Sequence, residues 1–256
     1  MKTYCFYVSL TREEIINILV TGAEGYIGSH LIPYLRDKGY NILPYTKDIL
    51  DFKNIDCLNM DMVIHLAALT GVRNSFDKQE EYYDTNVNGS RAIFKACVET
   101  NTKIIYASSS NAKEWWTNPY AVTKKIMEEI APSNSVGVRP HTVYPGRPDM
   151  LYDQLKRDPK SITYINGNHI RDFTHIEDFC SGVFTLLTNY DIIVHNNNKI
   201  IDIGTGFGQS VLTMARSMGW EGEIRNDPTP KEREFTIADT TILKSLGWEP
   251  KHRICS

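Results

Sequence analysis

The chain has 256 residues, enough for one large α/β domain or for one domain plus a small appendage. With 41% hydrophobic and 23% charged residues, its composition is ordinary for a globular enzyme. Its formal net charge of -3 excludes a bulk attraction to nucleic acid or to an anionic membrane surface. No apolar run approaches the roughly 20 residues of a membrane span. Five scattered cysteines, with no C-x-x-C pair and no zinc-type spacing, predict reduced thiols, a cytoplasmic location and no metal site.

Strands and helices alternate after an extension at residues 1–15. Short apolar runs predict strands at residues 16–22, 40–45, 61–68, 103–110 and 135–144, and helical spacing predicts helices at residues 26–39, 80–100 and 120–131. This alternation predicts an α/β fold with a Rossmann-type doubly wound parallel sheet. The pattern loosens after residue 145. We therefore expect a dinucleotide-binding domain at residues 16–145 and a small C-terminal substrate-binding lobe, residues 146–256, folded onto it.

The stretch "VTGAEGYIG" places Gly22, Gly25 and Gly28 directly between the first strand and the first helix. The first glycine permits a tight turn, the second lets the backbone approach a pyrophosphate, and the third allows close packing of helix and strand. The helix N-terminus adds free N–H groups for phosphate. The alternative is a turn in which glycine has only a packing role. A second glycine triplet, in "IGTGFGQS", comes too late in the chain to begin such a sheet.

The end of the second strand bears on the choice of dinucleotide. An acidic residue there favours NAD, whereas a cation accommodates the 2′-phosphate of NADP. The segment "LPYTKDILD" has no acid at the strand end, and Lys47 follows at once. We therefore expect NADP or NAD as the cofactor, with a preference for NADP, and Asp48 or Asp51 at the adenine edge. Lys47 as a solvated surface lysine is the alternative.

The stretch "NPYAVTK" begins a later helix. Asn118 is a good N-cap, and Pro119 suits the first helical position. Tyr120 and Lys124 then lie one turn apart on the same face. Taken alone, this pair is either a surface contact or a proton-transfer device.

The chain resembles the extended short-chain dehydrogenase/reductase family, in particular nucleotide-sugar epimerases of the UDP-galactose 4-epimerase type. The matching segments occur in order along nearly the whole chain: "VTGAEGYIGSHL", "DMVIHLAA", "KQEEYYDTNVNGS", "IIYASSS", "NPYAVTK", "VRPHTVYPGRPDM", "RDFTHIED", "DIGTGFGQSV" and "IADTTILKSLGWEP". Nine ordered segments are far more specific than any one of them.

The resemblance implies that Tyr120 is the catalytic acid/base, that Lys124 binds the nicotinamide ribose, and that Ser109 is the third catalytic group, with Ser110 the next choice. A lysine ammonium and an oxidised nicotinamide would both lower the pKa of the tyrosine towards neutrality. The full set of expected cofactor contacts is Gly22, Glu24, Gly25, Tyr26, Ile27, Gly28, Lys47, Asp51, Ala67, Ala68, Lys78, Tyr120 and Lys124.

The expected partner is a nucleotide-diphosphate sugar, and the resemblance implies substrate contacts from Ser110, Asn86, Thr142 and Arg171. The guanidinium of Arg171 suits a diphosphate. A surface ion pair is the alternative for Arg171, and a buried structural hydrogen bond is the alternative for Asn86.

The sequence also departs from the family pattern. Only ten residues separate Ser109 from Tyr120, where the family inserts a longer substrate loop. Trp115 and Trp116 in this segment either stack on a ligand or cover a shortened core. His141 and Thr142 stand where the family has Phe-Asn. No C-terminal arginine aligns with the one that binds the nucleotide in the family, and Arg233 is the candidate to replace it.

These observations favour a nucleotide-sugar epimerase. An NADPH-dependent nucleotide-sugar reductase of the same fold, or a catalytically silent NAD(P)-binding module, is the alternative. In this family, the helices expected at residues 80–100 and 120–131 pair across a two-fold axis. We therefore expect a homodimer, with Tyr83, Val87, Phe94 and Ile126 exposed on each protomer.

Overall fold

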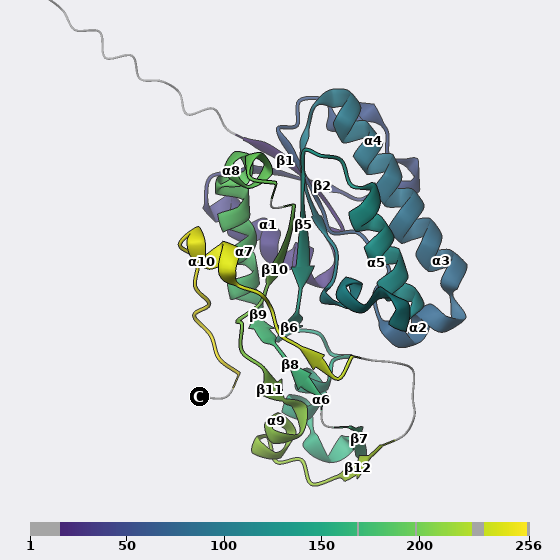
Figure 1. The fold of residues 1–256 in the computed structure, drawn as a ribbon, viewed down its shortest axis with the longest axis vertical. Coiled ribbons are helices and arrows are strands. Elements are labelled where there is room, and N and C mark those ends of the chain that lie inside the picture. Colours follow the sequence, from purple (N-terminus) through teal and green to yellow (C-terminus); the bar gives the residue numbers. More distant parts are fainter. Residues whose placement is uncertain (1–15, 168, 198, 227–232, 255–256) are drawn as a thin grey trace, which may run out of the picture.

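The computed structural model describes residues 16–167, 169–197, 199–226 and 233–254 (Figure 1). Its centre is a parallel six-stranded sheet in the order β10-β5-β4-β3-β1-β2. The strands of this sheet are β1 (Asn17–Thr21), β2 (Asn41–Tyr45), β3 (Met62–His65), β4 (Lys103–Ala107), β5 (Ser135–Pro140) and β10 (Ile200–Ile203). The predicted Rossmann-type parallel sheet is confirmed.

The strand order reverses next to β1. From β1 the chain continues to β2 on one side, whereas β3 pairs with β1 on the other side. Thr21 and His65, the last residues of β1 and β3, are direct partners in this register. A doubly wound sheet binds its ligand at such a switch point, beyond the carboxyl ends of the strands.

Helices cover both faces of the sheet (Figure 1). One face packs against α1 (Tyr26–Asp37), α7 (Ile176–Thr188) and α8 (Tyr190–His195), which bury residues such as Leu31, Phe179 and Ile193. The other face packs against α4 (Ser90–Thr100) and α5 (Pro119–Ile130), through Phe94 and Met127. The remaining helices of this half are η1 (Ile49–Asp51), η2 (Asn54–Cys57), α2 (Val72–Asp77), α3 (Gln79–Tyr83), the π-helix η3 (Asp84–Gly89) and the 3₁₀ segment η4 (Ser110–Thr117).

A smaller lobe lies below the carboxyl ends of the strands in Figure 1, with its own core around Tyr144, Phe173 and Trp220. Its elements are β6 (Thr142–Tyr144), α6 (Leu151–Arg157), η5 (Pro159–Ser161), β7 (Tyr164–Asn166), β8 (Ile170–Arg171), β9 (Phe173–His175), β11 (Gln209–Ser210), α9 (Val211–Ser217), β12 (Glu223–Arg225) and β13 (Phe235–Thr236). The chain also returns to the main body through α7, β10 and α10 (Thr241–Ser245). The division at residue 145 stays a prediction, and the expected extension at residues 1–15 lies outside the described residues.

The helix predicted at residues 80–100 is three successive segments, because η3 interrupts it with π-helical turns. A π-helical turn holds more residues than an α-helical one, so the face presented by α3 is not continued by α4. Val87 is fully buried, and Phe94 is 4% exposed within the protomer core. The expectation that these two side chains are exposed is therefore wrong, whereas Tyr83 is 42% exposed.

Among the described residues, no helix has the length and apolar character needed to cross a membrane.

Candidate active site

The glycine-rich loop joins β1 to α1 at the switch point. Gly22 has a φ of +67°, and a Cβ there would lie 2.6 Å from the backbone nitrogen of Ala67. A Cβ on Gly28 would lie 2.3 Å from the carbonyl oxygen of Gly22. On Gly25, by contrast, a Cβ would meet only that oxygen, at 3.1 Å, and otherwise open space. Gly22 and Gly28 thus permit the tight backbone, and Gly25 leaves room for a ligand to approach the start of α1.

A buried hydrogen-bond network holds the two strand ends together. The Thr21 hydroxyl lies 2.8 Å from Nδ1 of His65, and Nε2 of His65 lies 2.9 Å from the Ser90 hydroxyl. The Thr21 oxygen also accepts from the backbone N–H of Ala67 at 3.2 Å. Burial, followed by the positive charge of Lys124, lowers the pKa of His65 to about 3. The imidazole is therefore neutral and serves as a fixed link that places Ala67 and Ala68 beside the glycine loop.

The start of α5 positions the predicted tyrosine and lysine. The Asn118 side-chain oxygen accepts from the backbone N–H of Ala121 at 2.8 Å, which confirms it as the N-cap. Tyr120 is 8% exposed and Lys124 is 2% exposed. The Lys124 ammonium lies 6.0 Å from the centroid of the Tyr120 ring and donates to the carbonyl of Ala107, at the end of β4, at 2.8 Å. Both side chains point into the protein, so they do not form a solvent-exposed surface pair.

Ser109 lies at Tyr120. Its hydroxyl oxygen accepts from the backbone and side-chain N–H groups of Asn111 at 3.2 and 3.3 Å, which leaves its own proton to donate to the Tyr120 oxygen. Burial raises the pKa of Tyr120, and the hydrogen bond from Ser109 and the charge of Arg147 oppose that rise. Burial lowers the pKa of Lys124 to about 7, against the opposing charge of Glu128. The three groups therefore meet in one buried place where protons can move.

Asn86 lies in the π-helix η3, a type of distortion that is frequent at functional sites. Its side-chain oxygen accepts from the Leu69 N–H at 2.8 Å, and its amide donates to the Leu69 carbonyl and to the Thr123 hydroxyl, each at 3.0 Å. The Thr123 hydroxyl in turn donates to the carbonyl of Tyr120 at 2.8 Å. These bonds match the structural alternative for Asn86, and a contact with substrate stays a prediction.

The short segment η4 follows Ser109. The Ser110 carbonyl accepts from Arg233 at 2.8 Å, and the Arg233 guanidinium lies 2.8 Å from the Glu114 carboxylate. Arg233 thus reaches the serine run from the C-terminal part of the chain. Trp115 and Trp116 are 45% and 65% exposed, so they do not cover the core.

Lys113 of η4 belongs to a buried cluster of charged and polar side chains. Lys113 forms a salt bridge with Asp202 of β10, and Nε2 of His141 lies 3.3 Å from the same carboxylate. Burial would raise the pKa of Asp202, but hydrogen bonds from His141, Lys113 and the Asp239 N–H bring it to about 2. His141 therefore acts in packing and charge balance rather than as a group at Tyr120.

Arg171 and Thr142, which are predicted to contact the substrate, lie in the smaller lobe. Arg171 of β8 is half-buried and donates to the carbonyls of Ile170 and Glu234, and Thr142 begins β6 with its N–H on the Asp172 carbonyl. The buried Asp172 carboxylate accepts from the N–H groups of Thr205, Gly206 and Ala238 and from the Thr205 hydroxyl. Asp172 thereby organises the second glycine-rich loop, in agreement with its interpretation as a loop of the C-terminal part.

The remaining predicted cofactor residues lie in the first glycine loop, after the end of β2 and, for Lys78, between α2 and α3. Tyr26 donates from its hydroxyl to the Pro145 carbonyl at 2.5 Å, while Ile27 packs on the core beneath it and Glu24 is exposed. Lys47 is largely exposed and lies 3.3 Å from the Asp56 carboxylate. Asp51 is exposed in η1, and Lys78 forms an exposed pair with Glu81 at 3.1 Å.

Sequence reasoning missed Arg147, whose charge acts on Tyr120. It lies in the matched segment "VRPHTVYPGRPDM", directly after Gly146, and pairs with Asp149 at 2.7 Å. The only available signal was a cation after a Pro-Gly step, which is common on surfaces. Its segment is joined to the glycine loop, because the carbonyl of Pro145, two residues earlier, accepts a hydrogen bond from Tyr26.

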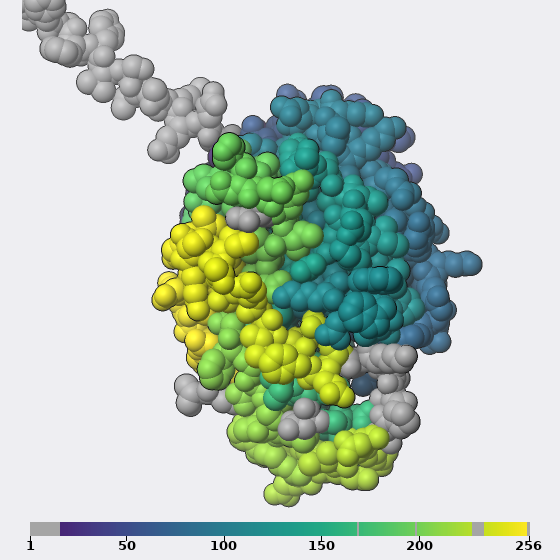
Figure 2. Space-filling model, viewed as in Figure 1, coloured from purple at the N-terminus to yellow at the C-terminus, as the bar shows by residue number. Residues whose placement is uncertain are grey.

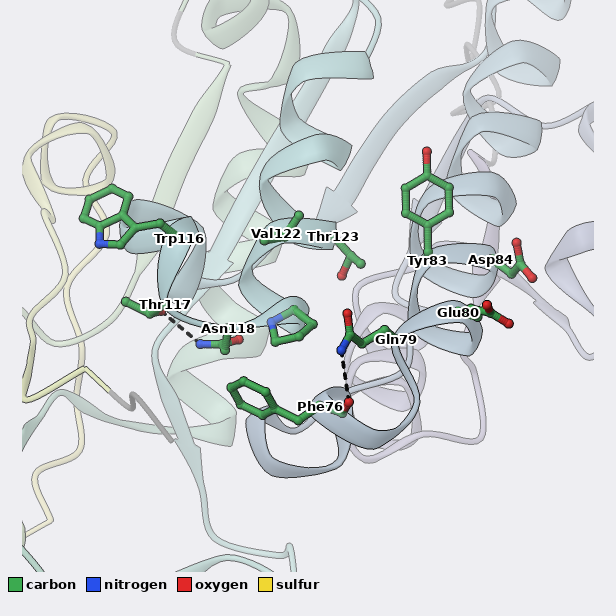
Figure 3. Close-up of a pocket in the computed structure, with 11 residues that line it drawn as sticks. Phe76, Gln79, Glu80, Tyr83, Asp84, Trp116, Thr117, Asn118, Val122 and Thr123 are labelled. Carbon is green, nitrogen blue, oxygen red and sulfur yellow. Dashed lines mark hydrogen bonds between the residues drawn. The ribbon is translucent and has the colours of Figure 1, made fainter. Parts of the chain in front are cut away.

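A cavity of about 850 Å³ lies outside this buried group, between α3 and the start of α5 (Figure 3). Val122 and Thr123 border it on one side, and Glu80 and Tyr83 border it on the other. Its other lining residues are Phe76, Gln79, Asp84, Trp116, Thr117, Asn118 and Pro119. The lining includes none of Ser109, Tyr120 and Lys124.

Comparison with known proteins agrees with this geometry. The NAD dependent epimerase/dehydratase family matches residues 18–204. The chain belongs to this family. A UDP-glucose 4-epimerase of Yersinia enterocolitica is 27% identical over 78% of this chain and 81% of its own. UDP-glucuronate 4-epimerase 4 of Arabidopsis thaliana is 30% identical over 92% of this chain and 72% of its own.

Solved structures show the same fold. MoeE5, in complex with UDP-glucuronic acid and NAD, superposes with a TM-score of 0.80 at 27% identity, over 93% of this chain and 95% of its own. The UDP-glucose 4-epimerase of Thermotoga maritima, solved with UDP-glucose, has a TM-score of 0.77 at 24% identity, over 93% and 95% of the two chains. The predicted membership in a nucleotide-sugar epimerase family is confirmed.

The burial of Lys124 predicts a pH-dependent contribution to stability. Its pKa falls from 10.5 in the unfolded chain to about 7 in the folded one, so the unfolded chain binds more protons between these values. The contribution of Lys124 to the free energy of unfolding therefore rises as pH rises from about 7 towards 10. Lys124→Met should abolish this rise, as measured by urea unfolding of both proteins across that range.

Lys125→Met is the matched control, because the neighbouring Lys125 is 32% exposed and pairs with Glu129 on the surface. It should leave the pH dependence unchanged. A difference between wild type and Lys124→Met that stays constant across this pH range would contradict the assignment.

Proposed function

We propose that this chain is a nucleotide-sugar epimerase that acts by reversible hydride transfer between a sugar carbon and a bound nicotinamide dinucleotide. The observation that carries the proposal is the buried meeting of Ser109, Tyr120 and Lys124 next to the glycine loop at the switch point. The relatives named as UDP-sugar 4-epimerases, and MoeE5 with its UDP-sugar and NAD, support the same reaction class.

In the proposed reaction, Tyr120 takes the proton from a sugar hydroxyl. Ser109 donates to the tyrosine oxygen and so favours the phenolate, and a charged Lys124 favours it further. A bound dinucleotide would supply the acceptor and donor of the hydride, and inversion would require the keto sugar to turn over so that the hydride comes back to the other face of the same carbon. Tyr120 then gives its proton back to the oxygen. No net redox change results.

The glycine loop fits the dinucleotide, because the position of Gly25 faces open space beside the first turn of α1. In the proposed complex, this turn holds the pyrophosphate and Lys124 holds the nicotinamide ribose. Ala67 and Ala68 border the cofactor. MoeE5 contains NAD. For this chain we propose a preference for NADP, because Lys47 follows β2, where a cation accommodates the 2′-phosphate.

For the substrate, we propose a nucleotide diphosphate sugar bound between the sheet and the lobe. Arg171 and Arg233 come from the lobe side, and Arg233 already contacts the Ser110 carbonyl. Thr142 and Asn86 complete the proposed contacts. We also propose that residues 146–256 act as the substrate-binding part and residues 16–145 as the dinucleotide-binding part.

Two alternatives keep the fold but change the outcome. A nucleotide-sugar reductase would consume NADPH in stoichiometric amount, and a silent binding module would form no product. Incubation with a panel of UDP-, GDP- and dTDP-sugars, with and without NADPH, separates the three. We expect epimerised product without net cofactor consumption.

Tyr120→Phe should slow turnover by roughly 10²–10⁴-fold, the usual range for a positioned acid/base. Because it removes one hydroxyl from a buried position, the fold and the dinucleotide affinity should stay nearly unchanged. Steady-state kinetics, circular dichroism and cofactor titration measure the three quantities. Tyr34→Phe, in α1, is the control and should keep wild-type turnover. A Tyr120→Phe protein that turns over substrate at the wild-type rate would refute the proposed mechanism.

Lys47 decides the cofactor preference. If it binds the 2′-phosphate, Lys47→Asp should weaken NADP binding by roughly 10- to 100-fold and NAD binding much less. The Asp56 carboxylate, which now faces the ammonium, would be exchanged for the phosphate. Lys53→Asp, an exposed lysine on the same connection, controls for the general change in charge. Equal losses for both dinucleotides would remove the argument for NADP.

We also propose a homodimer formed across the cavity between α3 and α5. Phe76, Tyr83 and Trp116 are 39%, 42% and 65% exposed around it, and Ile126 is half-buried on α5. Burial of this apolar rim against a second copy would remove it from water. Light scattering at micromolar concentration should report a dimer, and Tyr83→Asp should shift it to monomer. A wild-type monomer at that concentration would contradict the dimer.

Three described cysteines, Cys57, Cys97 and Cys180, are buried free thiols. They support the proposal that the protein works in the reducing cytoplasm.

A further inference from the structure

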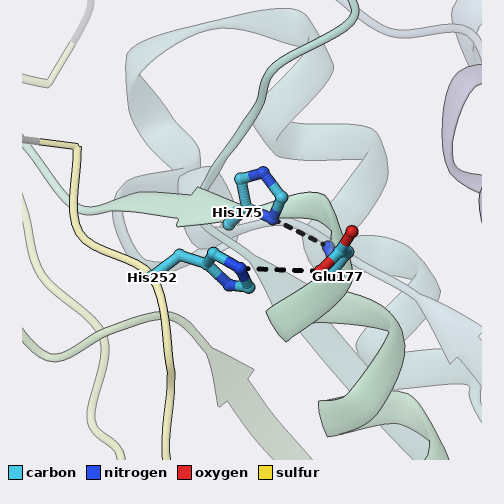
Figure 4. Close-up of side chains that lie close together, drawn as sticks. All are labelled: His175, Glu177 and His252. Carbon is cyan, nitrogen blue, oxygen red and sulfur yellow. Dashed lines mark hydrogen bonds and ion pairs between the residues drawn. The ribbon is translucent and has the colours of Figure 1, made fainter.

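Two histidines and a glutamate meet on the surface, on the side of the molecule where the C-terminal tail returns to α7. His175 ends β9 and caps α7, Glu177 lies in the first turn of α7, and His252 lies in the tail after α10. One ligand atom from each lies within 4.8 Å of the other two. Figure 4 shows the three side chains converging.

His252 is held in one orientation by a buried carboxylate. Asp178, which is 2% exposed, accepts from the backbone N–H groups of Lys251 and His252, each at 2.9 Å. It also lies 3.1 Å from Nδ1 of the His252 ring. With its proton on Nδ1, this ring presents the Nε2 lone pair to the Glu177 carboxylate, 3.5 Å away. A carboxylate behind an imidazole in this way is the usual support of a metal-binding histidine.

His175 also faces this place, but the lone pair on its Nδ1 caps α7, so a bound ion would replace that hydrogen bond. Its Nδ1 accepts a long hydrogen bond, 3.3 Å, from the Glu177 N–H. The two imidazoles stack with their centroids 4.1 Å apart. Imidazole nitrogen is a common ligand of transition metal ions.

We propose that His175, Glu177 and His252 form a binding site for a divalent transition metal ion of the zinc type. Zinc binds imidazole nitrogen and carboxylate oxygen at roughly 2.0–2.2 Å in a tetrahedron, whose ligand atoms are about 3.3–3.6 Å apart. The 3.5 Å between Nε2 of His252 and the Glu177 carboxylate has the length of such an edge, and all three ligand atoms lie within 4.8 Å of one another. Glu177 is 70% exposed and His252 is 37% exposed, so an ion has direct access from solvent.

The site would fasten the C-terminal tail to the start of α7. It is independent of the proposed epimerase chemistry, because Ser109, Tyr120 and Lys124 contribute nothing to it. The ligands come from two distant parts of the sequence, so no short sequence motif contains all three.

The test is isothermal titration of the full chain with zinc chloride at pH 7.5. We expect one zinc ion per chain, with at least 10- to 100-fold weaker binding for His252→Gln and for Glu177→Gln. Glu177→Gln changes an exposed side chain and keeps its size, so it tests the site without disturbing the core. His195→Gln, at the end of α8, is the control and should bind zinc as wild type does.

A second readout reports the tail itself. Zinc should slow tryptic cleavage at Lys251 and Arg253 in wild type and in His195→Gln, but not in His252→Gln or Glu177→Gln. Absence of stoichiometric binding, or equal zinc affinity in wild type and Glu177→Gln, would overturn the proposal.

Discussion

The pairing of β1 with β3 is the constraint on which the site depends. Their last residues, Thr21 and His65, are partners in the sheet and share a hydrogen bond between side chains at 2.8 Å. His65 is hydrogen-bonded to the Ser90 hydroxyl, which donates to the backbone carbonyl of Asn86. The side-chain amide of Asn86 donates to the Thr123 hydroxyl, which donates to the backbone carbonyl of Tyr120. The strand end that carries the glycine loop and the helix that carries Tyr120 therefore form one buried unit. A partly satisfied buried polar network is unfavourable, so the loss of a hydrogen bond at His65 also affects the start of α5.

The same burial sets the protonation of Tyr120 and Lys124. An unpaired charge inside a protein is unfavourable, so burial raises the pKa of Tyr120 and lowers that of Lys124. Ser109, Arg147 and Glu128 oppose these shifts. The neutral phenol and amine are thus favoured over the phenolate and ammonium, two states that are nearly equal in free energy in water. A positive charge bound beside Tyr120 would shift this balance back towards the phenolate, and the proposed proton transfer depends on such a shift.

The sequence was sufficient for the parallel sheet, the glycine loop and the Asn118 cap, because each depends on local backbone rules. It was insufficient for the exposed face of α3 and α4, since the π-helix at residues 84–89 has no reliable local signature and turns Val87 inward. The role of Asn86 in joining Leu69 to Thr123, and the closeness of Arg147 to Tyr120, depend on tertiary contacts between distant segments. The periodicity of the sequence carries no information about such contacts. It also carries none about the contact between His175 and His252.

The segment between Ser109 and Tyr120 is short, and contacts from the C-terminal part of the chain hold it in place. The kinked segment η4 is too short to build a substrate loop of its own, and its residue Glu114 has non-helical backbone angles. Instead, Asp202 of β10 pairs with Lys113, and Arg233 joins Glu114 to the Ser110 carbonyl. Two parts of the chain that lie far beyond residue 145 therefore hold the serine run in place. A substrate bound between the sheet and the lobe, as proposed, would act on this segment directly, because Arg233, the arginine proposed to bind it, already donates to the carbonyl of Ser110, the residue next to Ser109.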